Sequence, residues 1–261
     1  MRPSRRLTHA IVRLPSSNFH LGHTTIDLGE PDHSTALKQH GAYCEALKDC
    51  GLTLTLLPPD PQYPDSTFVE DAAVLTERCA IITRPGAESR RGEVTSIEKE
   101  LAKSFELMER IEAPGTVDGG DICEAGDHFF IGISQRTNEP GARQLAKLLT
   151  KYDYTSEFVD VRGVTDILHL KSGIAYLNEA RVVMIDELTS LLQFRRWSPI
   201  RVRSGEEYAA NCVLVNDSVL IAAGFPRIEG ELNQLGFKTV SLQMSEFQKM
   251  DGGLSCLSLR F

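Results

Sequence analysis

The chain ends in the stretch Gly253-Leu254-Ser255-Cys256-Leu257-Ser258-Leu259-Arg260-Phe261. Most chains end in polar, loosely held residues, whereas this one ends in the alternating apolar pattern of a strand. The glycine pair at Gly252 and Gly253 lets other groups approach the backbone closely just before a cysteine. We therefore expect the terminus to be part of the fold, with the Cys256 thiol as a candidate nucleophile. The alternative is a small, buried and inert cysteine.

Four earlier segments share one pattern, in which polar residues lead into two apolar strands around a turn. They cover residues 67–83, 116–134, 169–185 and 209–224. One marker residue per unit, plus the terminal cysteine, gives steps of 43 to 50 residues between Asp71, Asp121, His169, Cys212 and Cys256. A period of this size is typical of repeat and propeller architectures. The last unit has a first strand at the C-terminus but no second strand after it. An apolar strand at residues 10–13 could supply this second strand.

Amphipathic segments between these units predict helices. They cover residues 35–50, capped by Ser34, and residues 92–108, 142–152, 228–235 and 245–250. Residues 185–204 give no clear pattern. The sequence thus predicts one α/β domain over residues 1–261, a five-bladed pseudo-symmetric propeller of ββαβ units whose first strands point at a common axis.

The amino-acid composition and the cysteine pattern indicate which binding partners and which cellular compartment to expect. The net charge is −8 and the pI is about 5.4, which argues against nucleic acid because phosphate binding needs a basic surface. No segment has the ~18 apolar residues of a membrane span, and the N-terminus lacks a signal-peptide core. The six cysteines form no CxxC pair, so we expect reduced thiols in a cytoplasmic protein and no cysteine zinc site.

The ring brings the starts of the repeats together at its centre. The residues that would converge there are Glu70, Asp71, Asp118, Asp121, His169, Asn211 and Cys256. Several buried carboxylates need a cation to be tolerated. A metal is one candidate, but magnesium and calcium sites rarely include a thiol. A guanidinium fits better, because paired carboxylates hold it in fork geometry and a thiolate can attack its carbon.

Each of these residues also has an ordinary structural explanation. The acids at positions 70 and 71 could be a solvated strand end, and Asp118 and Asp121 could be turn residues beside flexible glycines. His169 is flanked by apolar residues, as a core histidine would be. All of these residues occupy equivalent positions in successive repeats. This shared position favours a functional site over several separate structural explanations.

The same residues resemble a known family, dimethylarginine dimethylaminohydrolase (dimethylargininase) of the guanidino-modifying (pentein) superfamily. The resemblance runs from about His9 to the C-terminus. It rests on Thr67-Phe68-Val69-Glu70-Asp71, Ile82-Thr83-Arg84-Pro85-Gly86-Ala87, Ser89-Arg90-Arg91, Asp118-Gly119-Gly120-Asp121, Arg136-Thr137-Asn138, His169-Leu170-Lys171, Ala210-Asn211-Cys212 and Asp251-Gly252-Gly253-Leu254-Ser255-Cys256. It implies the five-bladed ring and hydrolysis of asymmetric dimethylarginine or monomethylarginine to citrulline and an alkylamine, through an S-alkylthiouronium intermediate.

The resemblance also implies roles for single residues. Cys256 would be the nucleophile, His169 the general acid and base, and Asp118 the carboxylate that supports this histidine and the substrate guanidinium. The implied substrate-binding residues are Asp71, Glu70, Asp65 and Ser255 around the guanidinium, and Arg90 and Arg136 for the α-carboxylate. Asp118 departs from the Glu expected in bacterial members and matches the animal-type site. We expect residues 18–24 to cover the site.

Two other functions remain open from the sequence. An arginine or agmatine deiminase uses the same chemistry, and a ribosome-binding protein of the same fold uses none. We expect no cofactor, no resident metal, a cationic guanidino amino acid as the ligand, and a monomer or homodimer. Zinc held by Cys256 and His169 is a hypothesis for inhibition. The free Cys256 thiol is expected to titrate near or above neutrality.

Overall fold

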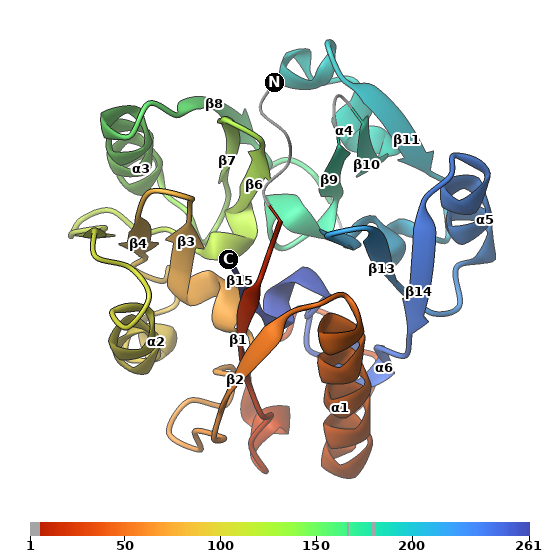
Figure 1. The fold of residues 1–261 in the computed structure, drawn as a ribbon, viewed down its shortest axis with the longest axis horizontal. Coiled ribbons are helices and arrows are strands. Elements are labelled where there is room, and N and C mark those ends of the chain that lie inside the picture. Colours follow the sequence, from red (N-terminus) through yellow and green to blue (C-terminus); the bar gives the residue numbers. More distant parts are fainter. Residues whose placement is uncertain (1–5, 166, 179–180) are drawn as a thin grey trace.

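The computed structural model describes residues 6–165, 167–178 and 181–261. Five three-stranded sheets stand around a central axis, each with its helix on the outside (Figure 1). In every sheet the inner strand runs antiparallel to the middle strand, and the middle strand runs parallel to the outer one. A parallel neighbour requires a crossover, which the helix provides. The predicted five-bladed ring of ββαβ units is confirmed.

The sheets follow one another along the chain, and the first is completed by the last strand. Listed from the inner to the outer strand, they are β15 (Leu259–Arg260), β1 (His9–Arg13) and β2 (Thr53–Leu57); β3 (Ala73–Leu75), β4 (Ala80–Ile82) and β5 (Met108–Arg110); β6 (Ile122–Ala125), β7 (His128–Ile133) and β8 (Thr155–Asp160); β9 (Ile174–Asn178), β10 (Arg181–Ile185) and β11 (Ser198–Val202); and β12 (Val213–Val215), β13 (Ser218–Ala222) and β14 (Lys238–Leu242).

The two ends of the chain close the ring. β15 pairs antiparallel with β1, with Ala10 opposite Arg260 and Ile11 opposite Leu259. The carbonyl of Phe261 also accepts the backbone N–H groups of Thr8 and His9, at 2.9 and 2.8 Å. The prediction that the N-terminal strand supplies the missing half of the last unit is therefore confirmed.

The helices pack outside the sheets and bury one face each. They are α1 (His33–Asp49), α2 (Val94–Leu101), α3 (Glu139–Lys151), α4 (Asp186–Thr189), α5 (Pro226–Gln234) and α6 (Ser245–Gln248). Two begin earlier than predicted because an upstream side chain caps them. The Asp32 carboxylate accepts the N–H of Thr35 at 2.7 Å, and the Asn138 side chain accepts that of Gly141 at 2.8 Å. Ser34 is therefore not the cap of α1.

The predicted helix at 92–108 is too long. α2 ends at Leu101, and residues 108–110 form β5, which pairs with β4. The apolar side chain of Phe105 that extended the helical pattern instead packs against Phe261, with ring centroids 5.2 Å apart. The unreadable region 185–204 contains α4, β11 and the short 3-10 helix η6 (Leu192–Phe194).

A 3-10 turn precedes each inner strand. The sequence pattern predicted that some of these residues would belong to the strand itself. These turns are η2 (Val69–Ala72), η4 (Gly119–Asp121), η5 (Leu170–Ser172), η7 (Glu207–Ala210) and η8 (Ser255–Leu257). Contacts join η8 to η2, η2 to η4, η4 to η5 and η5 to η7. Hydrogen bonds between Asn211 and Ser255 close the circle. The five turns therefore form a septum across the axis of the ring.

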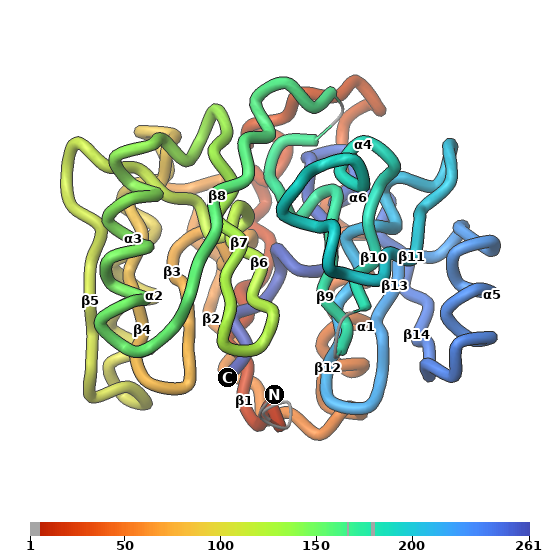
Figure 2. The backbone as a smooth tube through the Cα atoms, turned by 90° about the horizontal axis from the view of Figure 1, so that it is seen from above, coloured from red at the N-terminus to blue at the C-terminus, as the bar shows by residue number. Residues whose placement is uncertain are grey.

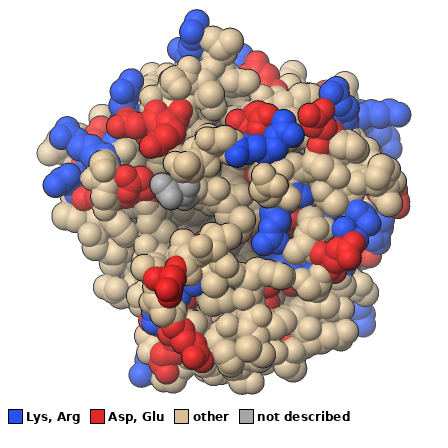
Figure 3. Space-filling view, turned by 180° about the vertical axis from the view of Figure 1, so that it is seen from behind, with Lys and Arg blue, Asp and Glu red and all other residues tan. Residues whose placement is uncertain are grey.

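The septum divides the ring into two sides. Figure 2 shows the start of β1 and the C-terminus on one side, with the hairpin turns, and the loop after β1 on the opposite side. We call these the hairpin side and the loop side. Figure 3 shows the loop side, where acidic and basic residues alternate around a hollow rather than forming one large patch. Among the described residues, no helix is long and apolar enough to span a membrane.

Candidate active site

The loop side of the septum holds a buried histidine against a buried carboxylate. His169 Nε2 lies 3.1 Å from Asp118 Oδ2, and Asp118 is fully buried. The other oxygen, Asp118 Oδ1, accepts the backbone N–H of Gly86 at 2.8 Å. The N–H of Asp118 in turn donates to Thr137 Oγ1 at 3.1 Å. Asp118 is thus held at three atoms, which fixes the carboxylate that orients the imidazole.

Asp71 approaches the same histidine from η2. Its Oδ1 accepts the N–H of Gly120 at 2.8 Å, and its Oδ2 pairs with the Arg90 guanidinium at 2.6 Å. Burial favours the neutral acid, but the charges of His169 and Arg90 outweigh this effect and lower the pKa of Asp71 to about 2. Asp71 therefore stays ionised in the folded protein.

The carboxylates set the charge of the imidazole. Burial disfavours the imidazolium, but the charges of Asp71 and Asp121 and the hydrogen bond that the imidazolium donates to Asp118 prevail and raise the pKa of His169 to about 9. His169 is consequently protonated at neutral pH. A buried imidazolium can donate a proton to a leaving amine and, once neutral, accept one from water.

Asp121 belongs to the predicted converging set but contacts the histidine loop through the backbone. Its Oδ1 accepts the N–H of Leu170 at 3.0 Å, and its Oδ2 accepts the hydroxyl of Ser134 at 2.6 Å. Its burial raises its own pKa. The residue therefore fixes the position of η5, the turn that follows His169.

Cys256 lies in η8, directly beside η2. Gly253 N is 3.4 Å from its sulfur. Burial and the negative charges of Glu70 and Asp71 raise the pKa of the thiol to about 12. Within the described residues no hydrogen bond links the thiol to His169. The resting pair is therefore a neutral thiol and an imidazolium, with the acids of η2 close by.

Glu70 and Ser255 face the hairpin side of the septum. Glu70 Oε1 pairs with Lys171 Nζ at 2.6 Å and lies 3.6 Å from the guanidinium of Arg260. Its Oε2 accepts the hydroxyl of Ser255 at 2.7 Å. Asn211 holds the same serine, donating to Ser255 Oγ at 3.1 Å and accepting Ser255 N–H at 2.9 Å. This network supports, from the hairpin side, the turn that carries Cys256.

Asp65 holds the loop that was expected to cover the site. Both of its carboxylate oxygens lie 3.1 Å from the backbone N–H of His23. A side chain at Gly22 would collide with Asp65 Oδ1, because a Cβ built there falls 2.2 Å away. Thr25 N–H donates to Asp251 at 2.5 Å. The loop of residues 18–25 is thus fastened over the loop side at Asp65 and Asp251.

The two arginines predicted to bind the substrate carboxylate differ in their surroundings. Arg90 is 5% exposed and is held by Asp71, by Glu93 and by the carbonyls of Asp65 and Phe68. The Arg136 side chain is partly buried, and its guanidinium makes no hydrogen bond or ion pair with the described residues. Arg136 is available to a ligand anion, whereas Arg90 is committed to organising Asp71.

Three of these residues have a geometry that could hold a cation. Ligand atoms of Asp71, Asp118 and His169 all lie within 4.8 Å of one another, and all three residues are buried. Cys256 is not part of this group, so the set differs from the zinc pair suggested by the sequence. Two carboxylates also suit an organic cation with N–H donors.

Sequence reasoning missed Glu93 and gave no role to Lys171. Glu93 accepts from Arg90 Nε and Nη2 at 2.9 to 3.2 Å, and burial raises its pKa to about 7 although Arg90 lowers it. The i,i+3 spacing of Arg90 and Glu93 beside a predicted helix was the available signal.

Comparison with solved structures first establishes the class of fold. The N-terminal domain of ArgZ, an arginine dihydrolase, superposes with a TM-score of 0.86 at 19% identity, covering 98% of this chain and 97% of that one. The chain thus has the same ring fold as that domain.

The family follows from closer similarity. Residues 29–190 match the family model described as N,N dimethylarginine dimethylhydrolase, eukaryotic. The N(G),N(G)-dimethylarginine dimethylaminohydrolase of Pseudomonas aeruginosa is 47% identical over 97% of this chain and 99% of its own length. A cysteine-to-serine variant of the Pseudomonas enzyme, solved with citrulline, has a TM-score of 0.95 at 46% identity and covers 98% of this chain and 100% of its own. Another structure, of a histidine-to-glycine variant, carries an adduct with S-methyl-L-thiocitrulline and has a TM-score of 0.94 at 46% identity, covering 98% and 100%. This chain belongs to the dimethylarginine dimethylaminohydrolase family.

Proposed function

We propose that this chain hydrolyses Nω-methylated arginine to citrulline and an alkylamine, with Cys256 as the nucleophile. The observation that carries the proposal is the buried group of Asp71, Asp118 and His169, whose ligand atoms lie within 4.8 Å of one another, beside a thiol whose pKa is raised by burial and by the charges of Glu70 and Asp71. Such a centre suits a substrate that brings its own positive charge. Membership of the family supports the choice of methylated arginine.

Binding of the guanidinium prepares the nucleophile. A cation beside Cys256 offsets the negative charges of Glu70 and Asp71 that raise the thiol pKa, so the thiolate forms in the complex rather than in the free protein. Asp71 and Asp118 accept the guanidinium N–H groups. Arg136, whose guanidinium is unpaired among the described residues, binds the α-carboxylate at the other end of the substrate.

The first half-reaction forms a bond from sulfur to the guanidinium carbon. The Cys256 thiolate attacks this carbon, and the tetrahedral intermediate expels dimethylamine or methylamine after His169 protonates the departing nitrogen. The product is an S-alkylthiouronium cation on Cys256 and a neutral imidazole. The proton on His169 at neutral pH, reflected in its pKa of about 9, is what this step needs.

The second half-reaction restores the protein. The neutral imidazole of His169 removes a proton from water, and the resulting hydroxide attacks the thiouronium carbon. The carbon–sulfur bond breaks with its electron pair returning to the Cys256 sulfur, which takes up the hydroxyl proton of the intermediate as neutral citrulline leaves. The proton that the thiol lost when the substrate bound ends on the released alkylamine. The sum is a cationic guanidinium and water going to neutral citrulline and an alkylammonium ion, which balances in atoms and charge. Asp118 orients the imidazole through both steps.

Citrulline release tests the proposal directly. The wild type and Cys256→Ala are each given asymmetric dimethylarginine, monomethylarginine, arginine and agmatine, and carbamoylputrescine is sought for agmatine. Citrulline from the methylated substrates, lost in Cys256→Ala but kept in the control Cys50→Ala, is the expected result. Cys50 is a matched control because it is also a partly buried free cysteine. Turnover of arginine or agmatine alone would indicate a deiminase, and no turnover of any of the four would overturn the assignment.

A further inference from the structure

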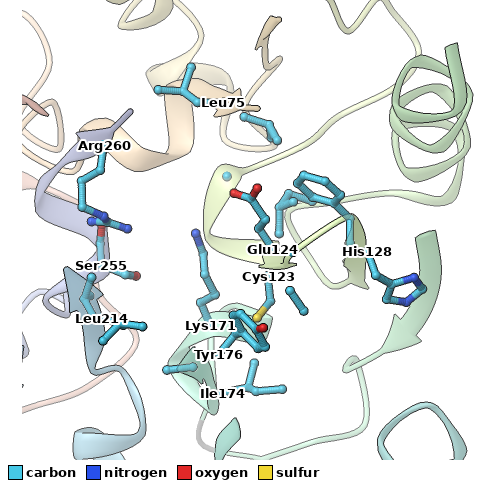
Figure 4. A pocket seen from close by; sticks show the side chains of 18 of the residues that line it. Leu75, Cys123, Glu124, His128, Lys171, Ile174, Tyr176, Leu214, Ser255 and Arg260 are labelled. Atoms are coloured by element: carbon cyan, nitrogen blue, oxygen red, sulfur yellow. The ribbon is translucent and has the colours of Figure 1, made fainter. Parts of the chain in front are cut away.

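A cavity lies behind the septum on the hairpin side, and we call it the hairpin-side cavity. Its volume is about 1430 Å³, and the inner strands of all five sheets contribute to its lining. Glu70, Lys171 and Ser255 line it at the septum, whereas Cys256 and His169 do not. Figure 4 shows Lys171 and Ser255 among the lining side chains. Because no side chains pack into this space, the turns of the septum depend on hydrogen bonds and ion pairs to hold them from this side.

The relative position of Cys256 and His169 depends on the turns that carry them. Within the described residues no hydrogen bond joins the two side chains. His169 directly precedes η5, and Cys256 lies in η8. Contacts and hydrogen bonds lead from η5 to η8 by two routes, one through η4 and η2 and the other through η7. The route through η7 has one intermediate turn instead of two.

Asn211, which directly follows η7, bridges the shorter route with its side-chain amide. The amide nitrogen Nδ2 donates to the carbonyl of Lys171 at 2.8 Å and to Ser255 Oγ at 3.1 Å. The amide oxygen Oδ1 accepts the N–H of Ser255 at 2.9 Å. Lys171 lies two positions after His169, and Ser255 directly precedes Cys256. One buried side chain thus joins the turn of the proposed acid and base to the turn of the proposed nucleophile.

The glycine pair before the nucleophile allows this amide to come close to the backbone. A Cβ built on Gly253 would lie 2.5 Å from both Cγ and Oδ1 of Asn211. A larger residue at position 253 would therefore displace either the amide or the backbone that leads into η8. The sequence pattern marked Gly252 and Gly253 as a point of close approach, and the group that approaches Gly253 is the Asn211 side chain.

We propose that Asn211 is a positioning residue, which keeps the Cys256 sulfur and the His169 imidazole aligned on the same substrate carbon. This inference rests on the proposed function. Both half-reactions need the alignment, because His169 protonates the amine that leaves this carbon and later activates the water that attacks it. A displacement of about 1 Å can lower a rate about 100-fold. The groups proposed to bind the substrate lie in η2 and at Asp118 and Arg136, so its affinity does not depend on the amide.

The kinetics of Asn211→Leu with asymmetric dimethylarginine test the proposal, because leucine is similar in size but makes no side-chain hydrogen bond. We expect kcat to fall about 100-fold, while KM stays within about threefold of the wild-type value. Asn216→Leu is the matched control, since Asn216 also makes three hydrogen bonds, with both backbone groups of Leu7 and with the carbonyl of Cys50. Both variants should lower the urea midpoint, but Asn216→Leu should keep the wild-type kcat. A wild-type kcat in folded Asn211→Leu, or an equal loss in both variants, would overturn the proposal.

Gly253→Ala displaces the same amide without removing it, and it decides the question if Asn211→Leu does not fold. The added methyl group collides with Asn211, so kcat should fall at least about tenfold while KM is retained. Gly230→Ala is the control, because a Cβ there meets no atom within 4 Å beyond its chain neighbours and its own helix backbone. An unchanged kcat in Gly253→Ala would overturn the positioning role.

A measurement that needs no turnover separates this inference from the proposed function. Chloroacetamidine and chloroacetamide both alkylate thiols and are similar in size, but only chloroacetamidine forms a cation. Asp71 and Asp118 should hold this cation against Cys256 in the wild type, so chloroacetamidine should react faster, as measured by peptide mass spectrometry. In Asn211→Leu the preference should fall at least about tenfold. A preference that is unchanged in Asn211→Leu or missing in the wild type, or a faster reaction with both reagents, would overturn the inference. If the wild type releases no citrulline, the proposed function fails, and the preference between the reagents still decides the role of Asn211.

Discussion

Replacing Asp118 with asparagine should lower the pKa of His169 while leaving the imidazole in place. Asp118 Oδ2 accepts from His169 Nε2 at 3.1 Å, and its other oxygen accepts the N–H of Gly86. Asparagine has the same shape and can keep an oxygen toward either group. The substitution therefore removes a charge and weakens one hydrogen bond without opening a cavity.

The expected size of the change follows from the hydrogen bond. A hydrogen bond to a charged group contributes about 1.5–3 kcal/mol, and one pKa unit corresponds to about 1.4 kcal/mol. The pKa of His169, about 9 in the wild type, should therefore fall by about one to two units. It should stay above the ordinary value, because Asp71 and Asp121 still favour the imidazolium.

NMR titration of isotopically labelled histidine measures this pKa. Asp160→Asn is the matched control, since it removes an exposed carboxylate that pairs with Arg162 and lies outside the site. A His169 pKa within a few tenths of the wild-type value in Asp118→Asn would refute the electrostatic role given to Asp118. So would an equal shift in the control.

The same substitution has a consequence for stability. The folded-state pKa of His169 lies above its unfolded value of 6.5, so its contribution is fully present below pH 6.5 and is lost as the pH rises through about 9. The 2.5-unit difference corresponds to about 3 kcal/mol. Urea unfolding of the wild type should lose about this much between pH 6 and pH 10, and Asp118→Asn should lose roughly half or less. Parallel curves would contradict the argument.

Three further substitutions separate the roles of neighbouring groups. Arg136→Gln should raise KM about 10- to 100-fold with an unchanged unfolding midpoint, because it removes one charge-assisted hydrogen bond to the substrate; an unchanged KM would exclude this arginine from the carboxylate site. Arg90→Met should instead lower the free energy of unfolding by about 3–5 kcal/mol, since it leaves buried Asp71 without its partner. A urea midpoint equal to that of the wild type would contradict this expectation. Gly120→Ala should lower kcat at least about tenfold, because a Cβ there falls 2.7 Å from His169 Nδ1 and displaces the imidazole; wild-type kcat in the folded variant would count against this geometry.

The sequence predicted the ring and the residues that meet at its centre for one reason. A repeat places equivalent positions at equivalent points of a closed fold, so Asp118 and His169 could be brought together although 50 residues separate them. The pairing of β15 with β1 followed from the same count of strands. The ends of the helices were harder to predict from the sequence. Asp32 caps α1 but lies outside the apolar pattern that predicted this helix. Phe105 continues the apolar pattern of α2 but packs on Phe261 instead of extending the helix.

The sequence pattern did not predict which groups each side chain contacts. Arg90 and Arg136 look alike in the sequence, but Arg90 is surrounded by Glu93, Asp71 and two carbonyls of the η2 region. Backbone carbonyls leave no trace in side-chain patterns. The binding of Asp65 to the N–H of His23 was hidden for the same reason.

The septum also explains why adjacent residues have different tasks. A 3-10 helix has three residues per turn, so neighbouring side chains point about 120° apart. Glu70 and Ser255 line the hairpin-side cavity, while Asp71 and Cys256, one position later, do not. In η2 and η8, a residue that lines the cavity on the hairpin side is thus followed directly by a residue of the candidate active site. Inserting one residue before Glu70 would therefore exchange the two sets and place Glu70 where Asp71 pairs with Arg90.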